Sequence, residues 1–149
     1  MGFGRFFDEF ILGQIFQHKA KKKITAKANA DFCQLTMNEH PLHTNDDYAQ
    51  NTIFGKCVVV GTFTASLAVG LSVSDISGKA IANLSYENII HHLPVFIGDT
   101  ISAETEILKI RESTSKDDRG IIYVETRAFN QHGEKVLSLR RHVLIPRKK

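Results

Sequence analysis

The pattern of hydrophobic and polar positions divides the chain into a helical first half and a strand-rich second half. Residues 11–24 have the pattern of an extended segment with a basic end. Thr25 is a helix-capping residue, and Ala28, Phe32 and Leu35 follow it at helical spacing. This pattern predicts a short helix over TAKANADFCQL. A second short helix is predicted to begin at Asp46 or Asp47 and to end at Gly55.

A third helix, from about Val60 to Leu71, is hydrophobic on nearly every side. The surrounding stretch, Cys57 to Val73, approaches the length of the shortest membrane spans, about 17 residues. Glycines and hydroxyl side chains lower its apolarity, however, and there is no second such segment to pack beside it. We therefore expect a helix buried in a protein core rather than in a membrane.

After Ser77-Gly78 the period changes to that of strands. Ile101, Ala103, Thr105 and Ile107 alternate with polar neighbours. Turn residues separate four predicted strands, with a loop at STSKDDRG and a hairpin turn at 130–133. The strands are KAIANLSYENIIHH, TISAETEIL, IIYVETRAFN and KVLSLRRHVLIP.

One apolar helix followed by antiparallel strands predicts an α+β hotdog fold, in which a curved sheet wraps a long central helix and buries its full circumference. We expect one domain over residues 1–149. Exposed strand edges in such a fold pair with a second copy, so we expect a homodimer or a higher homo-oligomer.

Composition changes this picture little. The chain has 149 residues, 42% of them hydrophobic, and a formal net charge of +3. Its lysines are not interleaved with aromatic side chains, so we expect no nucleic-acid partner. Cys33 and Cys57 lack the spacing of a zinc site, and we expect two reduced thiols in the cytoplasm and no metal. Acidic residues in the opening MGFGRFFDEF argue against a signal peptide.

The stretch LTMNEHPLHTND, residues 35–46, gathers chemistry-bearing side chains in a polar loop. Together with the order of elements, it resembles the MaoC-like dehydratases, the (R)-specific enoyl-CoA hydratase family of hotdog proteins. The family motif Thr-Gly-Asp-x-Asn-Pro-Leu-His matches residues 36–43. Phe54-Gly55, Val60-Gly61 and LPVFIGDTISAETEIL also match the family. RESTSKDDRGIIYVETRAFNQHGEKVL resembles the branch of mesaconyl-CoA hydratases and β-methylmalyl-CoA dehydratases.

The departures from the family pattern that matter for chemistry are at Asn38, His40 and Val60. Asn38 stands where the family has its catalytic Asp, His40 stands in place of the Asn before the proline, and Val60 replaces the His of His-Gly. The resemblance therefore implies a variant of the family's Asp and His pair, which holds one water between them.

This resemblance implies hydration of a 2-enoyl-CoA thioester, possible also in reverse, with a short, branched or dicarboxylic acyl group. His43 is the predicted principal base, and Asn38 is predicted to orient the water. His40 is a second candidate for the proton at C2. The backbone N–H of Gly61 or Thr62 is predicted to stabilise the thioester oxygen.

Coenzyme A enters only as part of the substrate, and no other cofactor is expected. Basic residues are available for its phosphates, but the sequence singles out none of them: the run KAKKK, Arg111, Lys116, Arg119, Arg140 and Arg141. Two other functions stay open. A hotdog thioesterase would release free thiol from a saturated acyl-CoA, and a non-catalytic acyl-CoA-binding or regulatory module would bind it without turnover.

Overall fold

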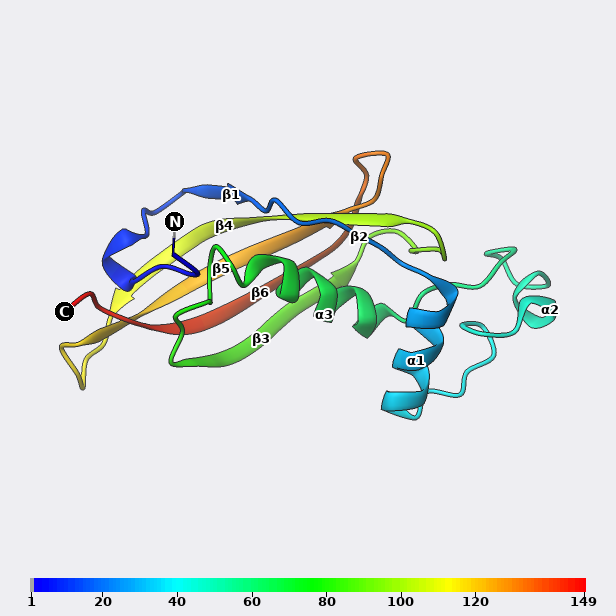
Figure 1. The fold of residues 1–149 in the computed structure, drawn as a ribbon, viewed down its shortest axis with the longest axis horizontal. Helices are drawn as coiled ribbons and strands as arrows, with labels where there is room; N and C mark the ends of the chain where they lie inside the picture. The colour runs from blue at the N-terminus through cyan, green and yellow to red at the C-terminus, as the bar shows by residue number, and fades with distance from the viewer. Residues whose placement is uncertain (1) are drawn as a thin grey trace.

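A long antiparallel sheet curves along one side of helix α3 (Gly61–Ser72), as the computed structural model of the protein shows for residues 2–149 (Figure 1). Short elements precede this helix: η1 (Phe7–Glu9), β1 (Ile15–Gln17), β2 (Lys22–Lys23), α1 (Ala26–Thr36) and α2 (Asp46–Ala49). Four long strands follow it: β3 (Ala82–His91), β4 (Thr100–Glu112), β5 (Arg119–Phe129) and β6 (Lys135–Pro146). The predicted hotdog fold is confirmed.

Strands β1 and β3 form the two edges of the sheet. Within residues 2–149 the strand order is β1-β4-β5-β6-β3, and β2 pairs with β4 beside β1. All of these pairs are antiparallel. One edge of β3 is therefore left without a neighbouring strand in the single chain.

The alternation predicted for the second half is visible in the packing against α3. Ile101, Ala103, Thr105 and Ile107 are all buried on the inner face of β4. Ile101 packs in one core with Ala65 and Ala68 of the helix and with Leu137 and Leu139. The bounds of β6 agree with the predicted strand KVLSLRRHVLIP.

The two short helices differ from their predictions in detail. Thr25 caps α1 as predicted, since its hydroxyl accepts the N–H of Ala28. The buried residues of α1 are Asn29 and Cys33, however, and Leu35 is exposed. The helix predicted over TAKANADFCQL is confirmed as Ala26–Thr36, with Leu35 on its exposed side.

Helix α2 ends at Ala49 rather than at Gly55. The hydroxyl of Thr52 donates to the Ala49 carbonyl at 2.6 Å, and the Thr52 N–H donates to the same oxygen. These bonds occupy the acceptor that a further helical turn would need. Gly55 lies beyond, in a turn with φ of 72°.

Helix α3 is not covered on every side by the single chain. Thr62, Ser66 and Gly70, spaced four residues apart, are exposed along one stripe of the helix. The sheet covers the opposite side, which buries Thr64, Ala65 and Ala68. The prediction that one sheet buries the full circumference was therefore wrong.

No helix within residues 2–149 combines the length and the apolarity that crossing a bilayer would require. Cys33 and Cys57 are both buried and carry free thiols.

A buried polar network ties the N-terminal segment to the sheet. The imidazole of His18 lies between Asp75 Oδ2, at 2.8 Å from Nδ1, and Thr105 Oγ1, at 2.7 Å from Nε2. Arg5 donates to the same carboxylate from its other side. Burial alone would raise the pKa of Asp75, but the hydrogen bonds from His18 and Arg5 outweigh it and hold this pKa below its usual range.

This network predicts a pH-dependent loss of stability in Asp75→Asn. A carboxyl whose pKa is lowered on folding stabilises the native state above its unfolded pKa and loses that effect as pH falls through the folded pKa. We expect the variant to unfold about 2 kcal/mol more easily at pH 7. The difference should shrink as pH falls below 3.8, the ordinary pKa of an aspartate carboxyl group. Urea unfolding of both proteins at several pH values measures this, and a constant difference would contradict it.

Candidate active site

The loop after α1 begins with a residue in the left-handed conformation. Met37 has φ of 60° and ends α1, after which the backbone turns sharply at Asn38. The Asn38 side-chain oxygen accepts the N–H of His40 at 3.2 Å. The His43 N–H then donates to the His40 carbonyl at 3.2 Å. These local bonds fold residues 38–43 into a compact turn rather than a helix.

His43 is oriented by a backbone carbonyl. Its Nδ1 lies 2.7 Å from the oxygen of Val58. A carbonyl oxygen can only accept, so Nδ1 carries the proton of this bond and, in the neutral ring, Nε2 keeps a free lone pair. A backbone hydrogen bond from the Val58 N–H to the Leu42 carbonyl joins the same two segments. The ring therefore presents its basic nitrogen away from Val58.

Asn29 links the histidine loop to the beginning of α3. It is 1% exposed, and its Nδ2 donates to the His43 carbonyl at 3.0 Å. Its Oδ1 accepts the N–H of Val60 at 3.1 Å. One buried amide thus fixes the distance between His43 and the amino end of α3, two segments that are distant in the sequence.

A cavity of about 320 Å³ lies between these two segments. His43 and Gly61 both line it, with histidines from the end of β3 and mostly apolar residues from the segments around them. Its other lining residues are Phe54, Val58, Val59, Thr64, His91, His92, Leu93, Pro94, Val95 and Val136. A mainly apolar cavity with a few converging polar groups is typical of a small-molecule site.

The amino end of α3 supplies hydrogen-bond donors to this cavity. The N–H groups of Phe63 and Thr64 donate to the Val60 carbonyl, but the structure gives no such acceptor to those of Gly61 and Thr62. Free donors and the helix dipole make this end favourable for negative charge. A Cβ on Gly61 would lie 2.6 Å from Cε1 of His91, so only glycine leaves this space open.

Thr64 adds a buried hydroxyl to the cavity wall. It is 2% exposed, and its Oγ1 has no hydrogen-bond partner within residues 2–149. Leaving a buried polar group unpaired costs about 1–3 kcal/mol, so this hydroxyl is suited to bind a ligand in the cavity.

The predicted site residues fall in three places. His43 and Gly61 share the cavity. Asn38 and His40 belong to the adjoining turn and are not among the residues that line it, although the rings of His40 and His43 are 5.9 Å apart. The side chain of Thr62 faces another cavity of about 380 Å³, which Tyr86 and Ile89 also line.

Four further residues of this region escaped the sequence analysis: Asn29, Thr64, His91 and His92. The sequence pattern indicates only a strand at His91 and His92, and only a buried helix at Thr64. The one signal available was a polar residue, Asn29, at a position of α1 where a core contact would be hydrophobic.

Other chemistry is not favoured at this site. The Cys57 thiol donates to Asp46 Oδ1 at 3.3 Å. Burial, followed by this contact, raises the pKa of Cys57, which disfavours a nucleophilic thiolate. Within residues 2–149 there is no group of three side chains that could hold a metal ion.

A larger hollow, of about 770 Å³, lies elsewhere. It is formed by the β4–β5 loop and Arg147, at the end of the sheet opposite α2 (Figure 1). Its lining is polar and charged throughout, which does not suit an acyl chain. The 320 Å³ cavity is therefore the better candidate.

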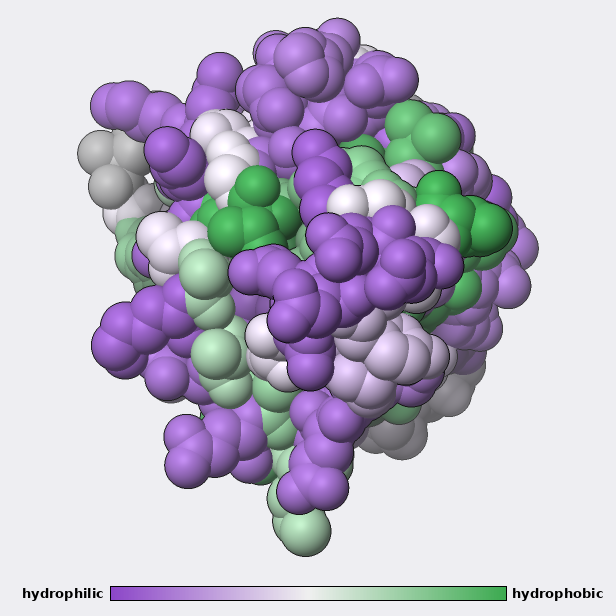
Figure 2. Space-filling model, turned by 90° about the vertical axis from the view of Figure 1, so that its right-hand side faces the viewer, coloured by the Kyte–Doolittle hydropathy of each residue, from purple (hydrophilic) through white to green (hydrophobic). Residues whose placement is uncertain are grey.

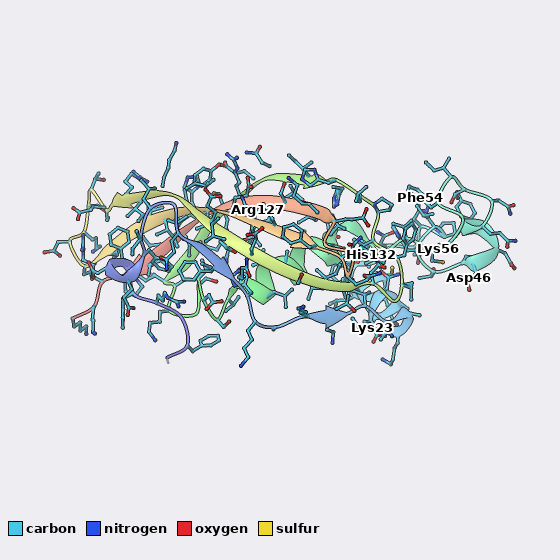
Figure 3. All side chains as sticks on the ribbon, turned by 90° about the horizontal axis from the view of Figure 1, so that it is seen from above. Lys23, Asp46, Phe54, Lys56, Arg127 and His132 are labelled. Atoms are coloured by element: carbon cyan, nitrogen blue, oxygen red, sulfur yellow. The ribbon has the colours of Figure 1, made fainter. Side chains whose placement is uncertain are left out.

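The end of the molecule near α2 is mostly hydrophilic, with hydrophobic residues in separate small patches (Figure 2). Asp46, Phe54 and Lys56 lie at this end, and Lys23 lies toward it, whereas Arg127 lies in the middle of the sheet (Figure 3). Arg111, Lys116 and Arg119 are far from it, at the β4–β5 hairpin.

Comparisons with known proteins identify the family of this chain. A family model described as "Mesaconyl-CoA hydratase" matches residues 2–149. The chain is 34% identical to a mesaconyl-CoA hydratase of Cereibacter sphaeroides, over 95% of this chain and 41% of that protein. It is also 34% identical to an (R)-specific enoyl-CoA hydratase of Aeromonas caviae, over 77% of this chain and 81% of that protein.

Among solved structures, a Mycobacterium tuberculosis protein with a double hotdog fold matches with a TM-score of 0.88 and 20% identity. The match covers 97% of this chain and 45% of that one. The chain covers 41% of the mesaconyl-CoA hydratase from Cereibacter, which is about two fifths of that protein's length.

Proposed function

The chain belongs to the mesaconyl-CoA hydratase family, and we propose that it adds water reversibly across the C2=C3 bond of a 2-enoyl-CoA thioester. The observation that carries this proposal is the cavity shared by His43 and the amino end of α3. A base and oxyanion donors at one cavity are what hydration of a conjugated thioester requires.

His43 is the proposed base. Its Nε2 accepts a proton from water while the water oxygen bonds to C3, and the electrons of the C2=C3 bond move toward the thioester oxygen. The Val58 carbonyl, on Nδ1–H, stabilises the positive charge that the ring then acquires. In the reverse reaction the protonated ring returns its proton to the departing hydroxyl.

The proposed oxyanion donors are the N–H groups of Gly61 and Thr62. Negative charge on the thioester oxygen is stabilised by donors that are already in position before the reaction. The Thr64 hydroxyl lies on the same cavity wall and is a further donor to the acyl group or to the attacking water.

Asn38 is proposed to orient water through its Nδ2, since its Oδ1 accepts from His40. An amide cannot take a proton from water. The absence of the family's acid at this position is also the observation that favours a second function, an acyl-CoA-binding module without catalysis.

The acyl group is proposed to be short, and branched or dicarboxylic, because the family and the Cereibacter relative are named for mesaconyl-CoA. Lys56, at the α2 end, and Lys23, on the side of the molecule toward it (Figure 3), are proposed to meet the phosphates of coenzyme A.

The test is a spectroscopic screen of crotonyl-, mesaconyl- and longer enoyl-CoA thioesters. Loss of the conjugated absorbance with retention of the thioester supports a hydratase. Release of free thiol from a saturated acyl-CoA would instead identify a thioesterase. Tight binding with no turnover of any substrate would identify the binding module.

A dimer through β3 is part of this proposal. The free edge of β3 carries exposed hydrophobic residues, which a monomer would leave open to aggregation. They are Leu84, Tyr86, Ile89 and Ile90 on the strand itself. Because the chain covers 45% of a protein with a double hotdog fold, a second copy can take the place of that protein's other half.

Light scattering is expected to give twice the chain mass of 16.7 kDa. Leu84→Lys with Ile90→Lys should convert the protein to monomer, because two charges would be buried unpaired at the interface. Ile53→Lys, at an exposed position away from β3, is the matched control and should stay dimeric. A monomeric parent protein, or a dimeric double variant, would contradict this interface.

A further inference from the structure

His91 closes the amino end of α3 from the sheet side. It is the last residue of β3 and pairs with Leu137 of β6. A Cβ built on Gly61 would lie 2.6 Å from its Cε1 and 2.9 Å from its Nε2. The reactive edge of the imidazole therefore lies directly over Gly61, inside the cavity that His43 also lines.

The proposed reaction moves two protons, and a second proton carrier can serve one of these movements. Hydration moves one proton away from water at C3 and brings one proton to C2. His43 serves the first movement, and Asn38, in place of an acid, cannot serve the second. Histidine is the side chain best suited to give and take a proton near neutral pH.

The position of the thioester decides where this second carrier must lie. The thioester carbon is bonded to C2, so a thioester oxygen held by the Gly61 N–H brings C2 close to the same end of α3. His91 is the histidine that lies against Gly61. We propose that His91 donates the proton to C2, an inference that rests on the proposed hydratase function.

In this step Nε2–H of the protonated His91 ring gives its proton to C2 of the enolate. The carbon–hydrogen bond forms from the electron pair that water addition at C3 placed on the thioester. His91 ends neutral and His43 ends protonated, and exchange with solvent restores both rings. In dehydration His91 removes the C2 proton instead.

The other histidines of the region are less suited to this role. His40 accepts the N–H of Leu42 on its Nδ1 and does not line the cavity. His92 lines it, but its Nε2 is hydrogen-bonded to the Ser138 hydroxyl at 2.8 Å. Within residues 2–149, no hydrogen bond of the His91 ring is found that would occupy it in this way.

The experiment compares turnover of the best enoyl-CoA substrate by His91→Gln, His91→Ala and His40→Gln. His132→Gln, at an exposed position in the β5–β6 turn, is the matched control. We expect kcat of both His91 variants to fall about 100-fold, at the lower end of the range for one proton-transfer group, with little change in KM. Added imidazole should restore at least part of the activity of His91→Ala and none of that lost in His91→Gln, where the side chain still fills the space.

The outcomes of this experiment distinguish failure of the His91 assignment from failure of the proposed hydratase function. If the parent protein hydrates no enoyl-CoA, the proposed function fails. If the parent is active and His91→Gln keeps its kcat, or His40→Gln alone loses kcat, the assignment of His91 is overturned. A His91→Ala variant with KM raised and kcat kept would show that His91 only shapes the cavity.

Discussion

His43→Ala is expected to lower kcat/KM for the best enoyl-CoA substrate about 1,000-fold. The variant removes the proposed base for water, and general-base catalysis contributes about 10²–10⁴-fold. No neighbouring group can replace it, because Asn38 cannot accept a proton and the reactive edge of His91 lies over Gly61. Initial rates followed by loss of the conjugated absorbance measure the effect.

The control for this variant is a measurement of its stability against unfolding. His43 is half-buried, and its side chain makes one hydrogen bond, to Val58, so urea unfolding should show a loss of only about 1 kcal/mol. Near-normal turnover in the folded variant would remove His43 from the reaction.

Gly61→Ala is expected to lower kcat about 100-fold. The new methyl group would meet the His91 ring at 2.6 Å, so the ring must move and the methyl must occupy the space that the thioester oxygen needs. Loss of one oxyanion donor costs about 10²–10³ in kcat. Steady-state kinetics on the purified variant measure this.

Gly70→Ala is the matched control on the same helix. A Cβ at Gly70 meets nothing within 4 Å, and alanine favours a helix over glycine by about 1 kcal/mol. This variant should keep its kcat and unfold at slightly higher urea concentration. Equal kinetics of the two alanine variants would contradict the role of the α3 amino end.

Most of the fold could be predicted because its signals are local. The alternation in β4 and β6, the cap at Thr25 and the turn at Gly133 each depend on residues close together in the sequence. The bounds of α3 were also predicted closely, since nearly continuous hydrophobicity identifies a core helix.

The candidate site could be predicted only where a motif marks it. His43 and Gly61 belong to matched motifs, and the structure brings them to one cavity. Asn29 and His91 do not, because their importance depends on contacts across 14 to 31 residues or on the register of β3 against β6. The local periodicity of hydrophobic residues does not indicate contacts between distant segments.

The exposed stripe of α3 was missed for a related reason. A hydrophobic helix in the sequence does not distinguish burial by its own sheet from burial by a second copy. Thr62, Ser66 and Gly70 are small enough to lie at either kind of surface, so only the three-dimensional arrangement separates the two.

The most direct test is a crystal structure of the protein with a bound 3-hydroxyacyl-CoA, the proposed product. We predict the C3 hydroxyl within hydrogen-bonding distance of His43 Nε2 and the thioester oxygen at the N–H of Gly61 or Thr62. An acyl group that lies outside this cavity, or with its C3 hydroxyl turned away from residue 43, would contradict the assignment of the catalytic site.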